Sequence, residues 1–466
     1  MKSSLNKIPM KKIIFVALLW NILIFSAYAQ KPSKETQQKK KKNFEVLTDE
    51  LLAKKIDSVS YLQQIQLLDQ VDVRSTEATL STTAFTTMSA GTVYFVNATA
   101  SGGSGLTWGT AFNNLQTALS VATAGDEIWV AKGTYKPTTN TQRTISFALK
   151  TDVSLFGGFT GNESAKEQRN WIANATILSG EIGGTAVTDN SDHVVTASSV
   201  TDVVLDGFIV EKGYASSSYG GGIFCSSVNN LTVENCTFRN NWSRYHGGAV
   251  YLLNTGGNVI NSVFYDNTAH LYDGGGYFAS GGVAKTIVGC LFYDNQAGRA
   301  GGAIEAYSQA NLVILNTTVS GNLAASFGNE VSSWGGATSL RNSLVYANTA
   351  SPSTLATPGG GSIYAYYSIV QHGGYIPGAG VIDTDPLFVN AGAKNFRLQA
   401  SSAGVDSGTP DVSGLPLPLK DLDGEIRIKR NHIDMGAYEE GEVDGPLIPN
   451  APANLVQNRP NDETAP

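Results

Sequence analysis

The segment VINSVFYDN at residues 259–267 recurs as IVGCLFYDN at residues 287–295. Its last residue belongs to a series of Gly and Asn residues that return every 26 to 28 positions. A fixed period of this length indicates a repeat architecture in which each unit is one supersecondary element. The series consists of Gly213, Asn241, Asn267, Asn295, Asn322 and Asn348.

Two apolar columns accompany this series at constant offsets. Eight residues before each member stand Leu205, Val233, Val259, Ile287, Ile314 and Leu340. Three residues before each member stand Val210, Phe238, Phe264, Phe292, Val319 and Val345. Units of short alternating segments cannot bury an apolar face alone, so we expect them to stack as turns of a solenoid, about 4.8 Å apart, with both columns inside.

The corners of such a turn need residues that accept a left-handed backbone. Asn tolerates this conformation and can also donate hydrogen bonds along the stack, and Gly pairs provide a further corner. The pairs are Gly221-Gly222, Gly247-Gly248, Gly275-Gly276 and Gly301-Gly302, and we expect Phe224, Val250, Phe278 and Ile304 to share the position two residues later.

Composition agrees with a turn-rich β-protein. Only 15% of the 466 residues are charged, 42% are hydrophobic and 50 are Gly. Charge well below the usual ~25% disfavours a helical bundle or coiled coil, and Gly without a three-residue period excludes collagen. From Ile56 onward the chain has 20 basic and 35 acidic residues, so we expect no nucleic-acid partner.

The repeats resemble those of right-handed parallel β-helix proteins, in particular the polymorphic outer-membrane-protein type with its Phe-x-x-Asn and Gly-Gly-Ala-Ile signatures. In this chain the signatures stand at residues 238–241, 247–250, 264–267, 292–295 and 301–304. The resemblance implies an all-β fold built on a right-handed single-stranded parallel β-helix. It also implies an exported bacterial protein, adhesin-like, at the cell surface or secreted.

The resemblance extends to both ends of the repeats. Residues 125–135 and 155–161 are similar to the opening coils of this secreted family, and those at 383–388 and 421–439 to its closing choice-of-anchor segment. Before them, Leu115, Ala118, Leu119 and Ala122 predict a short helical cap, which would protect the open N-terminal edge. We therefore expect a β-helix over 91–395, a closing segment that forms a C-terminal β/loop cap over 396–440, and a flexible tail over 441–466.

The first residues predict export. Lysines precede an apolar run at 13–25, and Ala27 and Ala29 stand where a signal peptidase recognises small residues, so we expect a signal peptide over 1–29 with cleavage before Gln30. The run is too short to span a bilayer, so the mature chain should lack a transmembrane helix. A basic linker with one amphipathic helix follows over 30–90. The expected location is secreted or on the outer surface of a Gram-negative bacterium, reached through secretion and anchoring machinery.

The three cysteines should remain free thiols. Cys236 and Cys290 occupy one offset two coils apart, about 9.6 Å at the β-spacing, whereas a disulfide needs its Cα atoms within about 7 Å. Cys225 is expected to point outward, away from Cys236.

One candidate site lies beside the repeating Asn. Asp266 and Asp294 precede it in adjacent coils, so their carboxylates should project about 5 Å apart, with Asn240 one rung away. Like charges at that distance repel unless a cation joins them, and calcium prefers such oxygen ligands. A solvated turn with screened charges is the alternative. For a catalytic site, the candidates are Asp266, Asp294 and the neighbouring Arg239, with Lys212 as the other nearby base.

Aromatic residues offer a second candidate. Tyr265, Tyr293, Tyr251 and Trp242 are expected to form a stacking face for sugar rings, although scattered surface aromatics are common. His193, His246 and His270 share no repeat offset and are predicted to be turn residues, as is the Asp421-x-Asp423-Gly424 segment.

Two classes of function fit these residues. The first is non-catalytic, adhesin-like binding of glycans or surface proteins. The second is a calcium-dependent polysaccharide lyase or glycoside hydrolase acting on acidic polysaccharide, which would need a pair of carboxylates or a base near the calcium. The sequence favours the first class because neither catalytic set is complete.

Overall fold

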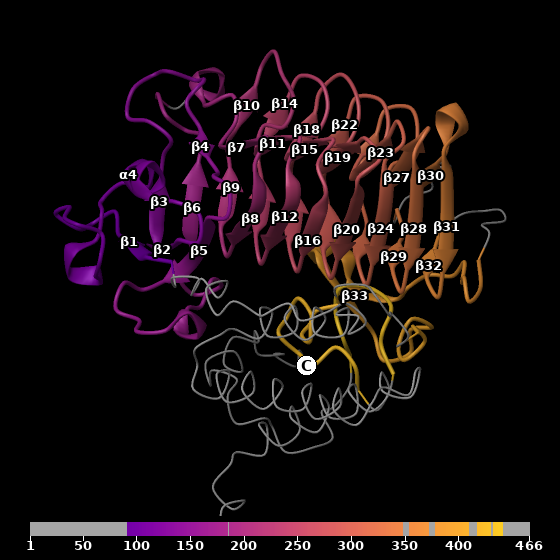
Figure 1. Ribbon diagram of the computed structural model, residues 1–466. Helices are drawn as coiled ribbons and strands as arrows, with labels where there is room; N and C mark the ends of the chain where they lie inside the picture. The colour runs from indigo at the N-terminus through magenta and orange to yellow at the C-terminus, as the bar shows by residue number, and fades with distance from the viewer. Residues whose placement is uncertain are drawn as a thin grey trace, which may run out of the picture. The chain divides into compact units, whose positions relative to one another are not determined.

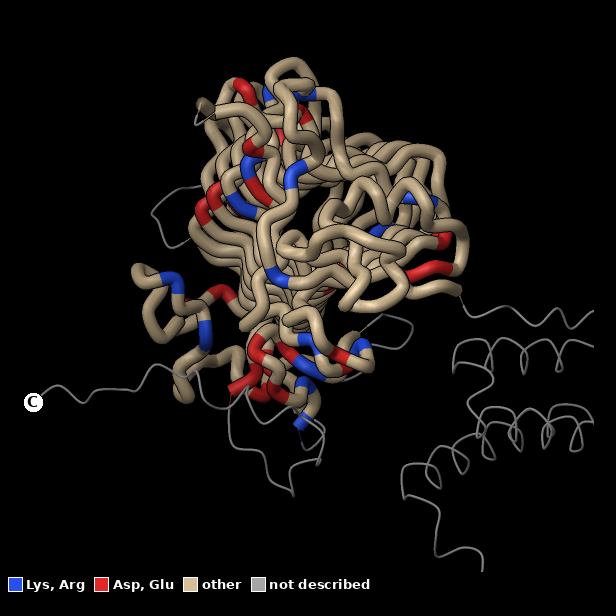
Figure 2. Tube along the Cα trace, turned by 90° about the vertical axis from the view of Figure 1, so that its left-hand side faces the viewer, with Lys and Arg blue, Asp and Glu red and all other residues tan. Residues whose placement is uncertain are grey.

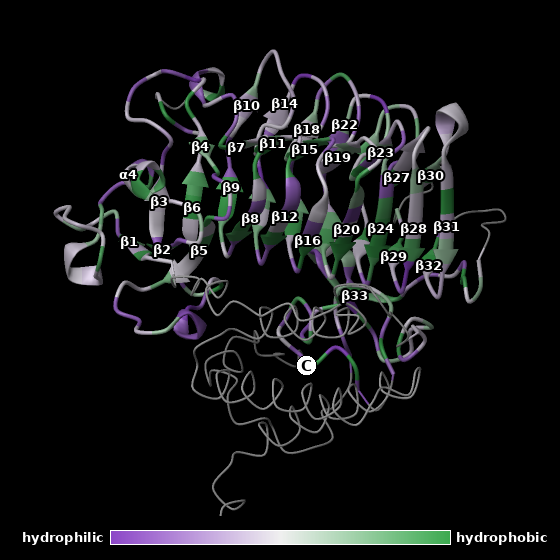
Figure 3. Ribbon diagram, viewed as in Figure 1, coloured by the Kyte–Doolittle hydropathy of each residue, from purple (hydrophilic) through white to green (hydrophobic). Residues whose placement is uncertain are grey.

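The computed structural model describes residues 91–184, 186–347, 354–371, 378–409, 417–429 and 432–440. The predicted signal peptide, the basic linker with its helix and the C-terminal tail lie outside the described residues. Within them the chain forms a right-handed parallel β-solenoid of about nine turns, as the repeats predicted (Figure 1). Figure 3 shows hydrophobic residues concentrated along its strands. No described helix is long and apolar enough to cross a membrane.

Each complete turn passes through four parallel sheets, in the chain order A, B, D and C. Sheet A contains β1 (Val93–Val96), β2 (Glu127–Ala131), β5 (Ser154–Phe159), β8 (Thr201–Asp206), β12 (Asn229–Glu234), β16 (Gly257–Ile260), β20 (Ala284–Val288), β24 (Asn311–Leu315), β28 (Ala337–Arg341) and β31 (Ser362–Tyr366). Sheet B contains β3 (Gly133–Tyr135), β6 (Thr176–Ser179), β9 (Ile209–Glu211), β13 (Thr237–Arg239), β17 (Val263–Tyr265), β21 (Leu291–Tyr293), β25 (Thr318–Val319), β29 (Leu344–Val345) and β32 (Ile369–Val370).

The other two sheets complete the turn. Sheet D contains β10 (Tyr214–Ala215), β14 (Trp242–Ser243), β18 (Thr268–Ala269), β22 (Gln296–Ala297) and β26 (Leu323–Ala324). Sheet C contains β4 (Phe147–Ala148), β7 (Val195–Ser198), β11 (Ile223–Ser226), β15 (Val250–Leu253), β19 (Tyr277–Ser280), β23 (Ile304–Tyr307), β27 (Val331–Trp334) and β30 (Leu355–Ala356). Short 3-10 turns lie at Trp108–Thr110, Lys166–Gln168, Val187–Asp189, Pro358–Gly360 and Ala391–Ala393.

The predicted apolar columns form the core. Val233 pairs with Val259, and Val259 with Ile287, so equal offsets lie on neighbouring rungs. In sheet B, Phe264 stacks on the Phe rings of the coils before and after it at centroid distances of 4.7 and 4.4 Å. All the predicted members of both columns are buried. Burial of each such side chain contributes about 1.5 to 3 kcal/mol, so the stack itself holds the fold together.

Four left-handed corners separate the strands of a turn. The A–B corner uses Gly207, Asn235, Asn261, Gly289, Asn316 and Asn342. The B–D corner uses Lys212, Asn240, Asp266, Asp294 and Gly321. The D–C corner uses Gly220, Gly247, Gly274, Gly301 and Gly328, and the C–A corner Ser199, Ser227, Asn254, Gly281 and Ser308. Gly, Asn and Asp dominate because they accept a positive φ most readily.

The repeating Asn residues do not adopt the predicted left-handed backbone, since the positive φ falls on the residue before each of them, but they do form the predicted hydrogen bonds along the stack. The side-chain amide of Asn241 donates to Asn267 Oδ1 at 3.0 Å, and the same bond joins Asn267 to Asn295 at 2.9 Å and Asn295 to Asn322 at 2.8 Å. Asn322 donates in turn to the carboxylate of Glu330. This buried ladder therefore runs in one direction and ends on a group that also accepts from the backbone of Gly321. Asn348 lies outside the described residues.

The N-terminal end of the solenoid carries the predicted helix. It is α4 (Leu115–Val121), and it buries Leu115, Ala118 and Leu119 in the core. Asn114 caps its first turn by accepting a hydrogen bond from Gln116 N at 2.7 Å.

The closing segment packs along the side of the solenoid. It begins earlier than the predicted residue 396, with the hairpin of β33 (Phe388–Asn390) and β34 (Asn395–Leu398), which places Phe388, Phe396 and Leu398 with Met435 against outward residues of sheet B, namely Leu291, Leu344 and Ile369. The A–B corner holds it further: the side-chain amides of Asn261, Asn316 and Asn342 donate to the carbonyls of Lys420, Asp434 and Thr409. It therefore covers successive coils laterally.

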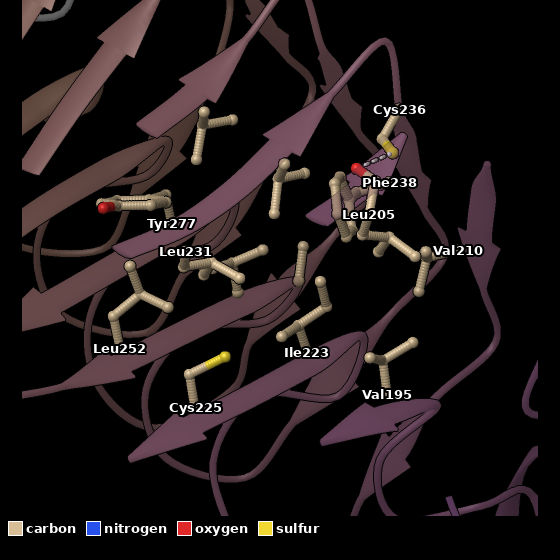
Figure 4. Close-up of a cluster of buried hydrophobic side chains, with 14 of the residues drawn as sticks. Val195, Leu205, Val210, Ile223, Cys225, Leu231, Cys236, Phe238, Leu252 and Tyr277 are labelled. Atoms are coloured by element: carbon tan, nitrogen blue, oxygen red, sulfur yellow. Dashed lines mark hydrogen bonds between the residues drawn. The ribbon is translucent and has the colours of Figure 1, made fainter. Parts of the chain in front are cut away.

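The thiol prediction is confirmed except for one orientation. All three cysteines are free and buried. Cys236 N donates to Ser262 Oγ on the next coil, and Ser262 N donates to Cys290 Sγ on the coil after that. Cys236 and Cys290 therefore lie two coils apart. Cys225, expected to face outward, points into the core instead, beside Leu252 (Figure 4).

The error arises from triple glycines. The left-handed residue is the first of Gly220-Gly221-Gly222 and of its counterpart at 274–276, so the pairs used for alignment were shifted by one position. Phe224 consequently aligns with Tyr251, not Val250, and faces outward.

Candidate functional site

The predicted metal pair lies at the B–D corner. Asp266 and Asp294 follow Tyr265 and Tyr293, which pair across adjacent rungs, and both acids adopt a positive φ near 54°. Asp is therefore suited to these two positions because it accepts the left-handed backbone more readily than most residues. Lys394 of the closing segment contacts Asp294 at 2.6 Å, so an ammonium group of this chain stands where a cation was expected. Partial burial, followed by the charge of Asp294, raises the pKa of Asp266.

The predicted catalytic base is also engaged. Arg239 forms an ion pair with Glu211 at 2.7 Å and donates to the Tyr265 hydroxyl at 3.2 Å. Tyr265 stacks on Tyr293 with centroids 5.0 Å apart. Phe396 of the closing segment lies 5.6 Å from the Tyr293 ring and covers part of it.

The four predicted sugar-stacking residues do not form one surface. Tyr265 and Tyr293 lie on sheet B, whereas Trp242 lies on sheet D and stacks on Tyr214 at 4.5 Å. Tyr251 belongs to sheet C. Of the candidates, only the sheet B pair comes together.

Sheet C carries a larger aromatic assembly, which the sequence analysis missed. Its outward column is Phe224, Tyr251, Phe278, Glu305 and Ser332 on successive rungs. Tyr251 stacks between the two Phe rings, at 5.5 and 5.2 Å. Although these side chains point away from the core, the last four members of the column are buried.

Rings from the D–C corner cover this column. Tyr219 stacks on Tyr251 at 4.7 Å, and His246 lies 4.4 Å from Phe278. We call the outer layer of rings the aromatic face; it comprises Tyr219, Tyr245, Tyr272, Tyr307, Phe327 and Trp334. It extends over five successive coils, from β11 to β27. Tyr272 and Phe327 are its most accessible members, at 39% and 44% exposure.

A charged group lies beneath these rings. Arg299 pairs with both carboxylate oxygens of the buried Asp273, with Nε 2.7 Å from Oδ1, and His246 Nδ1 lies 3.2 Å from Oδ2. Burial alone would raise the pKa of Asp273, but the hydrogen bonds from Arg299 and His246 lower it below its usual value. The guanidinium lies between two rings, 5.1 Å from Tyr272 and 4.4 Å from Trp334.

The pKa of Glu305 is shifted in the opposite direction from that of Asp273. Burial, followed by the charge of Asp273, raises the pKa of Glu305 to about 8. Its Oε1 accepts from the Trp334 backbone at 2.9 Å, whereas Oε2 is buried without a hydrogen-bond partner in good geometry. At neutral pH, Glu305 is therefore an uncharged acid next to an ion pair.

The sequence contains a signal for this site. Tyr219, His246, Asp273, Ala300 and Phe327 each precede the left-handed Gly of the D–C corner. His193 and His270 lie at other offsets, so the prediction that the three histidines share none is confirmed, but the aromatic counterparts of His246 at its own offset were not recognised.

Two further carboxylates lie on sheet A. Asp206 and Glu234 are paired positions of β8 and β12. Arg169 forms an ion pair with Asp206 and lies 4.9 Å from the exposed Trp171 ring. Burial, with a contribution from Asp206, raises the pKa of Glu234 to about 7. Elsewhere in the described ranges, no group of three or more His, Cys, Asp or Glu is arranged to hold a metal.

The match to a family model supports the fold, and two solved structures are distantly similar. Among solved structures the chain is similar to a pectate lyase, Pel9A, at 14% identity and a TM-score of 0.43, over 75% of this chain and 96% of that one. A rhamnogalacturonan lyase is similar at 12% identity and a TM-score of 0.35, over 63% and 74%. No curated protein matches. Residues 164–350 match the family described as "Right handed beta helix region", so this part of the chain is a right-handed β-helix.

Proposed function

We propose that this protein binds polysaccharide along the aromatic face of sheet C, as an exported, adhesin-like protein. The observation that supports this most strongly is the run of rings across five consecutive coils. Its rungs repeat at about 4.8 Å, close to the length of one hexose in an extended chain, so successive sugars would meet successive rings.

The chemistry of the face suits sugars. The C–H faces of a pyranose pack on aromatic rings, while Tyr hydroxyls and the Arg299 guanidinium can bond to hydroxyl groups. The guanidinium is oriented by Asp273 before a ligand arrives, so little side-chain entropy would be lost on binding.

Glycan binding by the full-length chain tests the proposal. The Tyr272→Ala/Phe327→Ala variant should lose about tenfold or more in affinity, measured by calorimetry with oligosaccharides selected on a glycan array. The matched control is Tyr364→Ala/Tyr367→Ala, which removes two similarly exposed rings at 44% and 39% and should bind as the wild type does. Equal losses in both variants, or binding to surface proteins but to no glycan, would refute the proposal.

Export is part of the same proposal and rests on the predicted signal peptide. Mass spectrometry of the protein from its native culture should find an N-terminus at Gln30 in the surface or medium fraction. Retention of the first 29 residues would contradict it.

Sheet A supports a second candidate, a glycoside hydrolase. Asp206 and Glu234 lie on adjacent rungs, about 4.8 Å apart at the backbone, near the ~5 to 5.5 Å between the two carboxyl groups of retaining enzymes. Glu234 would act as the acid, and Asp206, held by Arg169, as the nucleophile. New reducing ends that disappear in Glu234→Gln but persist in Glu305→Gln would establish this activity. Unsaturated ends would instead indicate a lyase, and the originally predicted Asp266, Asp294 and Arg239 would then be tested.

A further inference from the structure

The charges beneath the aromatic face are already neutralised within the protein. Asp273 has both oxygens on Arg299 and a further contact to His246. Its Oδ1 also accepts from Ala300 N at 3.1 Å. The guanidinium of Arg299 thus contributes hydrogen-bond donors and a flat surface to a ligand, but hardly any net charge.

The remaining groups add little positive charge. Glu305 is an uncharged acid at neutral pH, and burial lowers the pKa of His193, which packs on Phe224 at the N-terminal end of the same sheet. Arg244 approaches from the rim, 5.9 Å from the Tyr245 ring. In the end-on view of Figure 2, segments of Lys and Arg are interspersed with segments of Asp and Glu, and the whole sequence has a formal charge of -7.

A uronate carboxylate over Tyr272 and Trp334 would lose water next to a guanidinium that Asp273 already pairs, and the exposed Arg244 lies only at the rim. Desolvating a charge is costly when no partner compensates it, whereas a hydroxyl loses far less. The long-range field of a negatively charged protein opposes the same ligand.

We propose that the aromatic face takes uncharged glycans and discriminates against uronate-containing ones, because Asp273 neutralises Arg299. This rests on the proposed function and names its ligand class. Asp273 is then a specificity-determining residue: it sets the charge of the surface without touching the sugar.

The test compares a neutral β-1,4-linked hexasaccharide with an oligogalacturonate of the same length, by calorimetry with the full-length chain. The neutral ligand should bind at least about tenfold more tightly, and its affinity should be nearly independent of salt, since no net charge is exchanged. Tighter binding of the uronate would overturn the inference while leaving glycan binding intact. Binding of neither ligand by a folded protein would refute the proposed function itself.

The Asp273→Asn variant gives a gain-of-function arm. It frees the charge of Arg299 and should raise affinity for the oligogalacturonate about tenfold, with less than a twofold change for the neutral ligand. Asp152→Asn, at an exposed left-handed turn remote from these rings, is the matched control and should change neither. If Asp273→Asn unfolds, the salt dependence of the wild type replaces it: uronate affinity that rises with added salt supports the inference, and uronate affinity that falls with added salt contradicts it.

Discussion

The outer faces of sheets B and C show two ways of covering an outward apolar column. On sheet B, Leu291 and Leu344 are covered by Phe396 and Met435, more than fifty residues further along the chain. On sheet C, the rings around Tyr251 are covered by side chains from the adjacent corner of the same coils. On sheet B the covering residues form a second buried core, whereas on sheet C some of the covering rings remain partly exposed. Solenoid register alone therefore does not decide which face remains available to a ligand.

Removing a ring from each cover should produce the largest contrast. Phe396→Ala, at 2% exposure, is expected to cost about 3 to 5 kcal/mol of unfolding free energy because it leaves a cavity against sheet B. Phe327→Ala, at 44% exposure, should cost less than about 0.5 kcal/mol. Denaturant unfolding measures both, and similar losses would mean that the two covers do not differ.

The next largest loss of stability is expected in the buried Asn ladder, which runs from Asn241 to Asn322 between sheets B and C. Asn267→Ala removes the buried oxygen that accepts from both the backbone and the side-chain amide of Asn241, and leaves Asn295 Oδ1 with only the backbone donor of residue 267, so we expect a loss of about 2 kcal/mol. Gln296→Ala, an exposed change one position from Asn295, is the control. A negligible loss in Asn267→Ala would show that the amides do not support the stack.

Glu305 should make the sheet C side sensitive to pH. Its folded-state pKa of about 8 exceeds the ordinary 4.5, so its contribution is fully present below pH 4.5 and is lost as the pH rises through 8. Glu305→Gln should match the wild type near pH 5 and exceed its Tm by about 2 to 4 °C near pH 9. A difference that is constant with pH would contradict this. Burial also raises the pKa of Glu234, Glu330 and Glu439, but these groups cancel in the comparison because both proteins contain them.

The smallest effect is expected at the B–D corner. Lys394→Ala removes the ammonium beside Asp294 and should lower stability by less than about 1 kcal/mol, since the pair is partly exposed. Millimolar calcium should then raise the Tm of this variant more than that of the wild type. An equal response of the two would remove Asp266 and Asp294 as a calcium site.

The inward half of the structure could be predicted from the sequence. Core columns such as Val233 and Phe264 repeat with the coil, and so do the ladder amides, because each must match its neighbour on the next rung. The cap helix was predictable from its apolar spacing. These features depend on local period and residue type alone.

The outward half could not be predicted in the same way. Whether Asp294 stays solvated depends on Lys394, one hundred residues later, and nothing in the repeat announces that contact. The sheet C site was hidden differently, because a third glycine shifted the alignment by one, and one position exchanges the inside and outside of a strand.

The amide ladder also bears on how the protein can change in length. Every Asn passes its donor on in the same direction, and Glu330, whose two oxygens accept from the Asn322 side chain and from the backbone of Gly321, ends the series. Duplicating a coil ahead of Asn322 would insert one more link and keep the polarity intact. In a coil duplicated beyond Glu330, the first Asn oxygen would have no amide on the preceding coil to donate to it. Growth of this solenoid by internal copying is therefore expected on one side of Glu330 only.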